Sequence, residues 1–238
     1  MCVRVWDWSE TSQTVSVFTR AHGVVRAVAK GAKRDHARFS GGLEVLTRGQ
    51  VGVSLKGGEA LSILTSWDLV ETFPAARTSL RSFHAGMLML DVAHRAVHDH
   101  DPHGALYDAL VAGARSLGEP RAEAVGLLRL VWAAVSDTGH RPQVVADAGT
   151  QAALPDASTY GFAPRLGGVV RDGGDGGGGP VWRVRAETVA LLRALAEGRG
   201  GVDRAEAATV DRATRLLLMY YREVFAVDPP TIRRFLGE

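Results

Sequence analysis

The chain has 238 residues, with 28 basic against 26 acidic residues and a formal net charge of only +2. This length allows one large or two smaller domains, and the near balance of charge neither favours nor excludes a nucleic-acid partner. No apolar run approaches the roughly 18 residues that a membrane span needs, and the first residues lack the basic start and apolar block of a secretory signal. We therefore expect a cytoplasmic protein with no membrane partner.

The first part of the chain, up to about residue 76, has the pattern of short strands separated by glycine turns. Val15 and Val17 alternate with hydroxyl residues, as in a half-buried strand, and a second strand is expected over 24–30. Segments 51–55 and 61–64 flank Gly57-Gly58, where a tight hairpin needs positive φ. This pattern predicts a small barrel or sandwich.

From about residue 78 the apolar period becomes helical, with Thr78 or Ser79 as the predicted N-cap. The predicted apolar stripes are Phe83, Met87, Leu90 and Val97; Leu106, Leu110 and Leu117; Ala124, Leu128, Val131 and Val135; and Val210, Leu217, Tyr221 and Val224. Asp203 and Glu206 predict a capping box before the last helix, and Pro229-Pro230 its end. The fold class is therefore α+β, with domains over 1–76 and 77–238.

A stretch near 143–180 lacks either period and ends in the glycine-rich run 173–179. We expect a flexible insert there. A phosphate-binding loop is excluded, because no Lys-Ser/Thr pair follows the glycines and no strand-to-helix pattern surrounds them.

Basic residues gather in one short segment of the predicted barrel that contains a single acid, Asp35. They are Arg20, Arg26, Lys30, Lys33, Arg34 and Arg38. Alternation places Arg26 and Lys30 on one face of their strand, and Val25, Ala27 and Ala29 on the core face. Barrels that bind single strands without sequence preference use such a face to follow a phosphate backbone. The alternative is a solvated strand whose charges prevent edge pairing.

Nearby aromatic residues leave both possibilities open. Trp6 and Trp8 share a face if their segment is extended, and either could stack on bases or pack inside, whereas Phe18 suits a core.

A histidine cluster offers a competing hypothesis, a metal-dependent hydrolase. His94 and His98 have the i, i+4 spacing of helical metal ligands, with His100, His103, Asp91, Asp99 and Asp101 nearby. No glutamate lies between them as a general base, and histidines also suit a helix C-terminus. No Gly-x-Ser-x-Gly motif exposes a nucleophile. We expect no enzyme activity, no metal and no cofactor.

The third predicted helix carries a possible partner site. Arg121, Arg129 and Trp132 lie in one sector beside the apolar stripe, as a basic rim that would suit an acidic peptide with a hydrophobic end. The alternative is a core tryptophan between two solvated arginines.

A series of landmarks, taken in order, resembles the RecO family of bacterial recombination mediators. They are Trp8-Ser9-Glu10-Thr11-Ser12, Phe18-Thr19-Arg20-Ala21-His22-Gly23, the segment Val25 to Arg34, Asp101-Pro102 before Leu106-Tyr107, Gly139-His140-Arg141-Pro142-Gln143, and Arg233-Phe235-Leu236. No single landmark is decisive, but the ordered set covers nearly the whole chain.

The resemblance implies an N-terminal OB fold over 1–76 and a helical part over 77–238. It implies a nucleoid-associated protein that binds and anneals single-stranded DNA, partners RecR, and binds the acidic tail of single-strand-binding protein, so that RecA loads onto coated DNA. The basic residues of the barrel would then contact DNA. A protein adaptor with a vestigial barrel remains the alternative.

One departure concerns zinc. Many members of the family carry two cysteine pairs after the Gly-Arg-Pro-Gln landmark, but the corresponding segments here, 145–149 and 168–172, contain none. Cys2 is the only cysteine, so we expect neither a disulfide nor structural zinc.

Overall fold

The computed structural model describes residues 1–33, 39–40, 43–56 and 61–238. The chain forms two compact units, Met1–Gly118 and Glu119–Glu238. The predicted division at residue 76 follows the change of sequence period, whereas the division by packing falls later, because two long helices pack with the barrel. Among the residues described, no helix has the length and apolar character to cross a bilayer.

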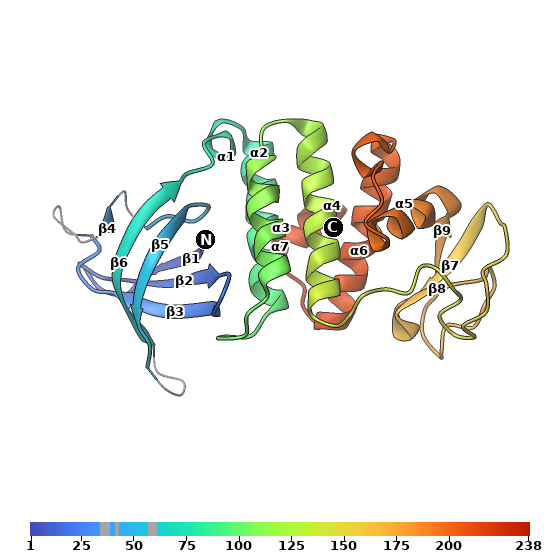
Figure 1. Ribbon diagram of the computed structural model, residues 1–238, viewed down its shortest axis with the longest axis horizontal. Helices are drawn as coiled ribbons and strands as arrows, with labels where there is room; N and C mark the ends of the chain where they lie inside the picture. Colours follow the sequence, from blue (N-terminus) through green and yellow to red (C-terminus); the bar gives the residue numbers. More distant parts are fainter. Residues whose placement is uncertain (34–38, 41–42, 57–60) are drawn as a thin grey trace. The chain divides into compact units, whose positions relative to one another are not determined.

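The first unit is built on a small β-barrel (Figure 1). Its strands are β1 (Cys2–Asp7), β2 (Gln13–Thr19), β3 (Gly23–Ala29), the short β4 (Phe39–Ser40), β5 (Arg48–Ser54) and β6 (Ser62–Glu71). The sheet order is β1-β2-β3-β6-β4, with β5 on β6. The Cys2 N–H donates to the Thr47 carbonyl at 2.8 Å, which joins β1 to the start of β5 and closes the barrel. With β3 parallel to β6, this is the OB-type barrel that was predicted.

The barrel core confirms the predicted strand faces. Val25 is 2% exposed and Ala27 and Ala29 are fully buried, where they pack with Trp67. Arg26 and the following Lys30 are exposed. The predicted glycine hairpin at 57–58 lies outside the described residues.

Three helices complete the first unit: α1 (Ala75–Thr78), α2 (Leu80–Ala96) and α3 (Gly104–Arg115). The Ser79 hydroxyl caps α2 by accepting from the Ser82 N–H at 3.5 Å, as predicted. The predicted stripe of α2 is partly wrong, because Phe83 is 40% exposed. The helix instead buries Gly86, where any β-carbon would come within 2.6 Å of Leu46.

The second unit combines helices with a small sheet (Figure 1). The helices are α4 (Pro120–Asp137), α5 (Ala186–Ala196), α6 (Ala207–Phe225) and α7 (Pro230–Leu236). The strands are β7 (Thr159–Ala163), β8 (Gly168–Val170) and β9 (Trp182–Arg185), in the order β8-β7-β9. The segment expected to be an irregular insert therefore holds β7 and β8, whereas the glycines at 173–179 lie in turns and loops.

Two predicted helix ends differ in this unit. The capping box is wrong: Asp203 lies in a 3₁₀ turn (Val202–Arg204), and Glu206 occupies the N-cap of α6 without a side-chain cap bond. Asp203 is held there because its carboxylate accepts from Arg129 at 2.9 Å. The helix ends at Phe225, with Ala226 in the left-handed conformation, and Pro230 begins α7 instead of ending α6.

Candidate nucleic-acid interface

The outer face of the sheet, opposite the core, is laid out in rows that cross several strands. Directly paired residues of adjacent strands share a face. The register aligns Trp6 with Thr14, Thr14 with Val28, Val28 with Ile63, and Ile63 with Ser54. We call these five residues the open row. It crosses β1, β2, β3, β6 and β5 in turn.

Helices cover the neighbouring part of this face within the first unit. Phe18 is fully buried and its ring meets that of Tyr107 on α3 edge-to-face, with centroids 5.7 Å apart. In the row of Arg4, Ser16 and Arg26, Ser16 is fully buried. In the open row, by contrast, Trp6 is 47% exposed and Val28 is half-buried. The face is thus closed at one end and accessible at the other.

Arg26 lies where the covered and open parts meet, and it already has an anionic partner. Its Nε lies 3.0 Å from Oδ2 of Asp99, in the segment that follows α2. Beside it, Arg4 pairs with the buried Asp91 of α2. These contacts anchor the barrel to its helices.

Arg20, in the turn between β2 and β3, is also paired. Its guanidinium donates to both carboxylate oxygens of Asp108 on α3, at 3.0 Å for the closest contacts. These hydrogen bonds hold the pKa of the Asp108 carboxyl below its ordinary value. Both side chains are more than half exposed, so the pair is accessible to a competing anion.

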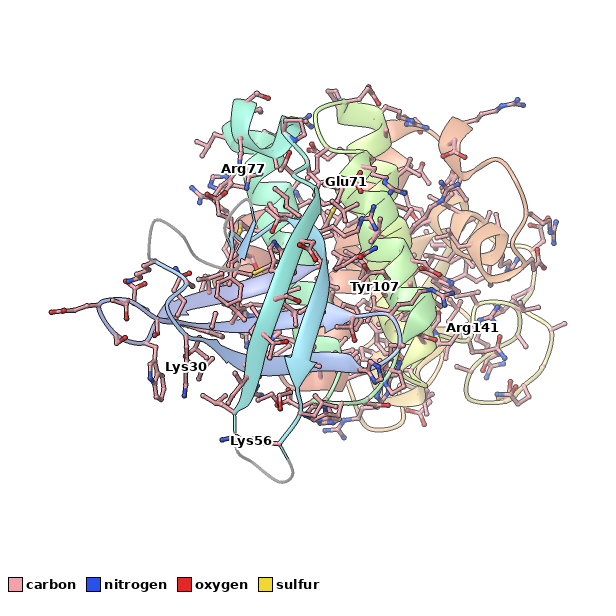
Figure 2. All side chains as sticks on the ribbon, turned by 60° about the vertical axis from the view of Figure 1, so that its left-hand side comes forward. Lys30, Lys56, Glu71, Arg77, Tyr107 and Arg141 are labelled. Atoms are coloured by element: carbon pink, nitrogen blue, oxygen red, sulfur yellow. The ribbon has the colours of Figure 1, made fainter. Side chains whose placement is uncertain are left out.

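Lysines mark the accessible end of the face. Among the described residues, Lys30 has no acidic partner within ion-pair distance. Lys33 pairs with Asp7 at 2.7 Å. Lys56 follows β5 by two residues and is exposed; Figure 2 shows the Lys30 and Lys56 side chains projecting outward from the barrel. The predicted residues Arg34 and Arg38 lie outside the described part of the chain.

Two tryptophans accompany these lysines. Trp8, in the turn after β1, is 62% exposed, more than Trp6. This turn lies beside the segment after β3, because the Gly31 N–H donates to the Ser12 hydroxyl at 3.2 Å and the Lys33 N–H to the Thr11 carbonyl at 3.1 Å. The accessible end therefore combines exposed aromatic rings with basic side chains.

The predicted histidine cluster does not come together. Across the described residues, no three histidine, cysteine or acidic side chains form a group that could hold a metal ion. His103 pairs with Asp101 at 3.1 Å. Burial, together with the positive charges of Arg4 and Arg26, lowers the pKa of His94 to about 4, so this imidazole is neutral near pH 7.

The residues predicted to bind a protein partner lie on α4 in the second unit. Arg121 donates to the carbonyls of Asp203 and Ala205, and Arg129 pairs with the Asp203 carboxylate. Trp132 is 9% exposed, and the Arg141 guanidinium lies 5.8 Å from the centre of its ring. Both arginines thus contact the turn before α6, and Trp132 is largely buried.

Sequence reasoning missed two kinds of residue at this interface. Lys56 had a signal, because it continues the alternation of β5 two residues beyond Ser54. The carboxylates Asp99 and Asp108 had none, because only the fold brings residues so distant in the chain against Arg26 and Arg20.

The barrel is of the OB type, a class of small barrels that includes proteins that bind oligonucleotides or oligosaccharides on one face. Comparison with known proteins gives the family. The family model described as "Recombination protein O N terminal" matches residues 2–73, and "Recombination protein O C terminal" matches 77–230. The chain belongs to the RecO family of DNA repair proteins.

Individual relatives agree with this assignment. The chain is 31% identical to DNA repair protein RecO of Anaeromyxobacter dehalogenans over 240 residues, which cover 99% of this chain and 93% of the relative. It is 37% identical to DNA repair protein RecO of Rhodopirellula baltica over 106 residues, 44% of this chain and 39% of that relative. A third relative, from Thermobifida fusca, is 30% identical over 166 residues, which cover 69% of this chain and 59% of the relative.

Proposed function

We propose that this protein is a recombination mediator that binds single-stranded DNA on its barrel and anneals complementary strands. With RecR, it would help RecA load onto DNA coated by single-strand-binding protein. Its action is binding rather than catalysis. Membership of a family of DNA repair proteins supports the general role.

The observation that supports DNA binding is the group of basic side chains beside the open row. Arg26 lies on the outer face of β3, Lys30 directly follows the end of this strand, and both side chains are exposed. Lys33 and Lys56 add positive charge at the same barrel. Sequence-tolerant single-strand binders combine such a groove of cations with a small barrel.

A second candidate function, a protein adaptor with a vestigial barrel, has its own support. Arg20, Arg26 and Lys33 each pair with a carboxylate of this chain. Charges that serve only to hold segments of the first unit together would look the same. The two functions differ in what salt does to oligonucleotide binding.

We expect the affinity for a single-stranded oligonucleotide to fall steeply with salt. If about four phosphates are neutralised, the slope of log affinity on log salt is about −3, and raising salt from about 50 to 200 mM weakens binding roughly 50-fold. Lys30→Ala should reduce the magnitude of this slope by up to ~0.7. Fluorescence anisotropy across a salt series measures both quantities.

Lys56→Ala is a second test of the same prediction, and Arg183→Ala is its matched control. Arg183 lies on β9 in the second unit and is exposed, so its removal should leave the slope unchanged, whereas Lys56→Ala should reduce it. A salt-independent affinity, or no affinity at all, would favour the adaptor.

For the protein partner, we propose that the acidic tail of single-strand-binding protein binds near Arg121, Arg129 and Trp132 on α4. Arg129 and Asp203 are both about half exposed, so the arginine can exchange partners with a peptide carboxylate. Trp132 is mostly covered, and its truncation is expected to cost about 3–5 kcal/mol of stability. Charge reversal at Arg129 is therefore the cleaner test.

Arg129→Glu should slow association of an acidic tail peptide, most clearly at low salt, because rim charges act mainly on the association rate. Stopped-flow fluorescence or surface plasmon resonance measures this rate. Arg183→Glu is the control, since Arg183 is also exposed and near an aspartate, Asp172. Equal rates for the two variants and the unsubstituted protein would place the tail site elsewhere.

A further inference from the structure

The most exposed tryptophans of the first unit lie at the accessible end of the barrel, not in its core. Trp8 is 62% and Trp6 47% exposed, whereas Trp67 in the same barrel is fully buried. Large aromatic side chains bury much apolar surface when they pack. Leaving two of them in water on one edge therefore calls for a ligand with an apolar face.

The residues around these two tryptophans indicate what kind of ligand this is. Trp6 begins the open row, which continues over Thr14 and the half-buried Val28. Lys30 follows Val28 by two residues, and the turn that carries Trp8 is hydrogen-bonded to the segment between Gly31 and Lys33. Two exposed indole rings and two lysines thus lie on adjacent segments at one end of the barrel.

We propose that Trp6 and Trp8 stack on successive bases of a single strand, while Lys30 and Lys33 contact the phosphates between them. This inference rests on the proposed DNA binding and adds the element that distinguishes a single strand from a duplex. Bases in a duplex are stacked on one another and do not present free faces to a side chain. A base–aromatic stack tolerates any sequence, because every base has a π face.

The lysines and tryptophans should leave different signatures in binding. Removing a stacked ring costs affinity without changing the number of counterions released, whereas removing a lysine changes the salt slope. Trp8→Ala and Trp6→Ala are each expected to weaken binding of an oligothymidylate about 10-fold, at an unchanged slope. Lys30→Ala should reduce the magnitude of the slope instead.

A second oligomer isolates the bases from the phosphates. An abasic oligomer of equal length and charge should bind the unsubstituted protein about as weakly as the double variant Trp6→Ala/Trp8→Ala binds oligothymidylate. Trp8→Ala alone should bind the two oligomers more nearly alike than the unsubstituted protein does, because one of the two stacking contacts is gone. Val70→Ala, another exposed apolar substitution on the barrel, should behave like the unsubstituted protein, and thermal melts confirm that each variant is folded.

The results separate the two levels of the proposal. If the unsubstituted protein binds with a steep salt dependence but Trp6→Ala and Trp8→Ala bind as tightly as it does, the stacking is overturned and the charge-based DNA binding stands. If the unsubstituted protein binds neither oligomer, the DNA-binding function itself is contradicted. A selective loss of affinity for oligothymidylate supports both.

Discussion

Replacing Asp147 by alanine is expected to destabilise the sheet of the second unit by about 3 kcal/mol or more. This carboxylate is 5% exposed. Its Oδ1 accepts from the N–H groups of Gly149 and Thr150 at 3.0 Å, and its Oδ2 from the N–H of Arg171 at 2.9 Å. Hydrogen bonds to a charged group are the stronger kind, and alanine leaves all three donors without a partner. Hydrogen exchange of the amides in β7 and β8, with a urea melt, measures the loss.

Asp147→Asn is the matched variant. Its amide oxygen can still accept from Gly149 and Thr150, but its NH₂ group would face the Arg171 N–H, donor against donor. Asparagine should thus preserve the local turn and lose the link to Arg171. If Asp147→Asn is as stable as the unsubstituted chain, that link contributes nothing.

The same carboxylate should make this unit sensitive to acid. The hydrogen bond from the Arg171 N–H, with those from Thr150 and Gly149, holds the pKa of the Asp147 carboxyl below its ordinary value, against the opposing effect of burial. A lowered pKa contributes stability that is present above the unfolded pKa, near 4, and is lost as pH falls through the folded pKa. Asp147→Asn should flatten that part of the stability profile.

Asp147 joins the two segments, 145–149 and 168–172, in which the resemblance to the RecO family would place cysteine pairs. It lies within 145–149, and Arg171 within 168–172. The Ala148 N–H adds a second tie to the Val169 carbonyl at 2.7 Å. A buried carboxylate and backbone bonds thus link the segments in this chain.

Gly23→Ala should be the most damaging small substitution in the first unit, costing about 3 kcal/mol. Gly23 has φ of +61°, and an added β-carbon would lie within 2.6 Å of the Asp101 backbone N and C. The close approach lets the His100 N–H donate to the Val24 carbonyl at 3.0 Å and keeps Asp99 beside Arg26. Alanine has to push this segment away.

Gly139→Ala supplies the control, because Gly139 also has positive φ, +85°, but nothing lies within 4 Å of an added β-carbon. It should cost only the conformational strain, about 1–2 kcal/mol. The difference between the two variants, measured by urea unfolding, isolates the steric contact. Equal losses would show that the contact at Asp101 relaxes freely.

The barrel was predictable because glycine turns separate its short strands and β2 alternates in polarity. In β2, Val15 and Val17 alternate with Thr14 and Ser16, so one short segment reveals both faces. The long helices were predictable for a similar reason. The burial of single helix residues was not: Phe83 has the spacing of the apolar stripe yet is 40% exposed, whereas the small Gly86 is buried against Leu46.

The small sheet of the second unit escaped prediction because its strands are too short to show a period. β8 has three residues and lies between glycine 167 and the turn at 172. Similarly, the candidate cations Arg20 and Arg26 were visible in the sequence, but not that Asp108 and Asp99 would pair with them. Ion pairs between distant segments depend on packing that no local pattern encodes.

These ion pairs provide the barrel with internal competitors for phosphate. A phosphate that binds Arg26 would displace Asp99, which would then be hydrated. The phosphate contact therefore replaces one ion pair by another and adds little net attraction. Such an exchange is nearly balanced, and a modest change in the geometry of the strand reverses it. If the protein binds DNA as proposed, such a surface would hold a flexible strand loosely and release it once it has become a stiff duplex. Weak retention of the product is what the proposed annealing of two strands requires.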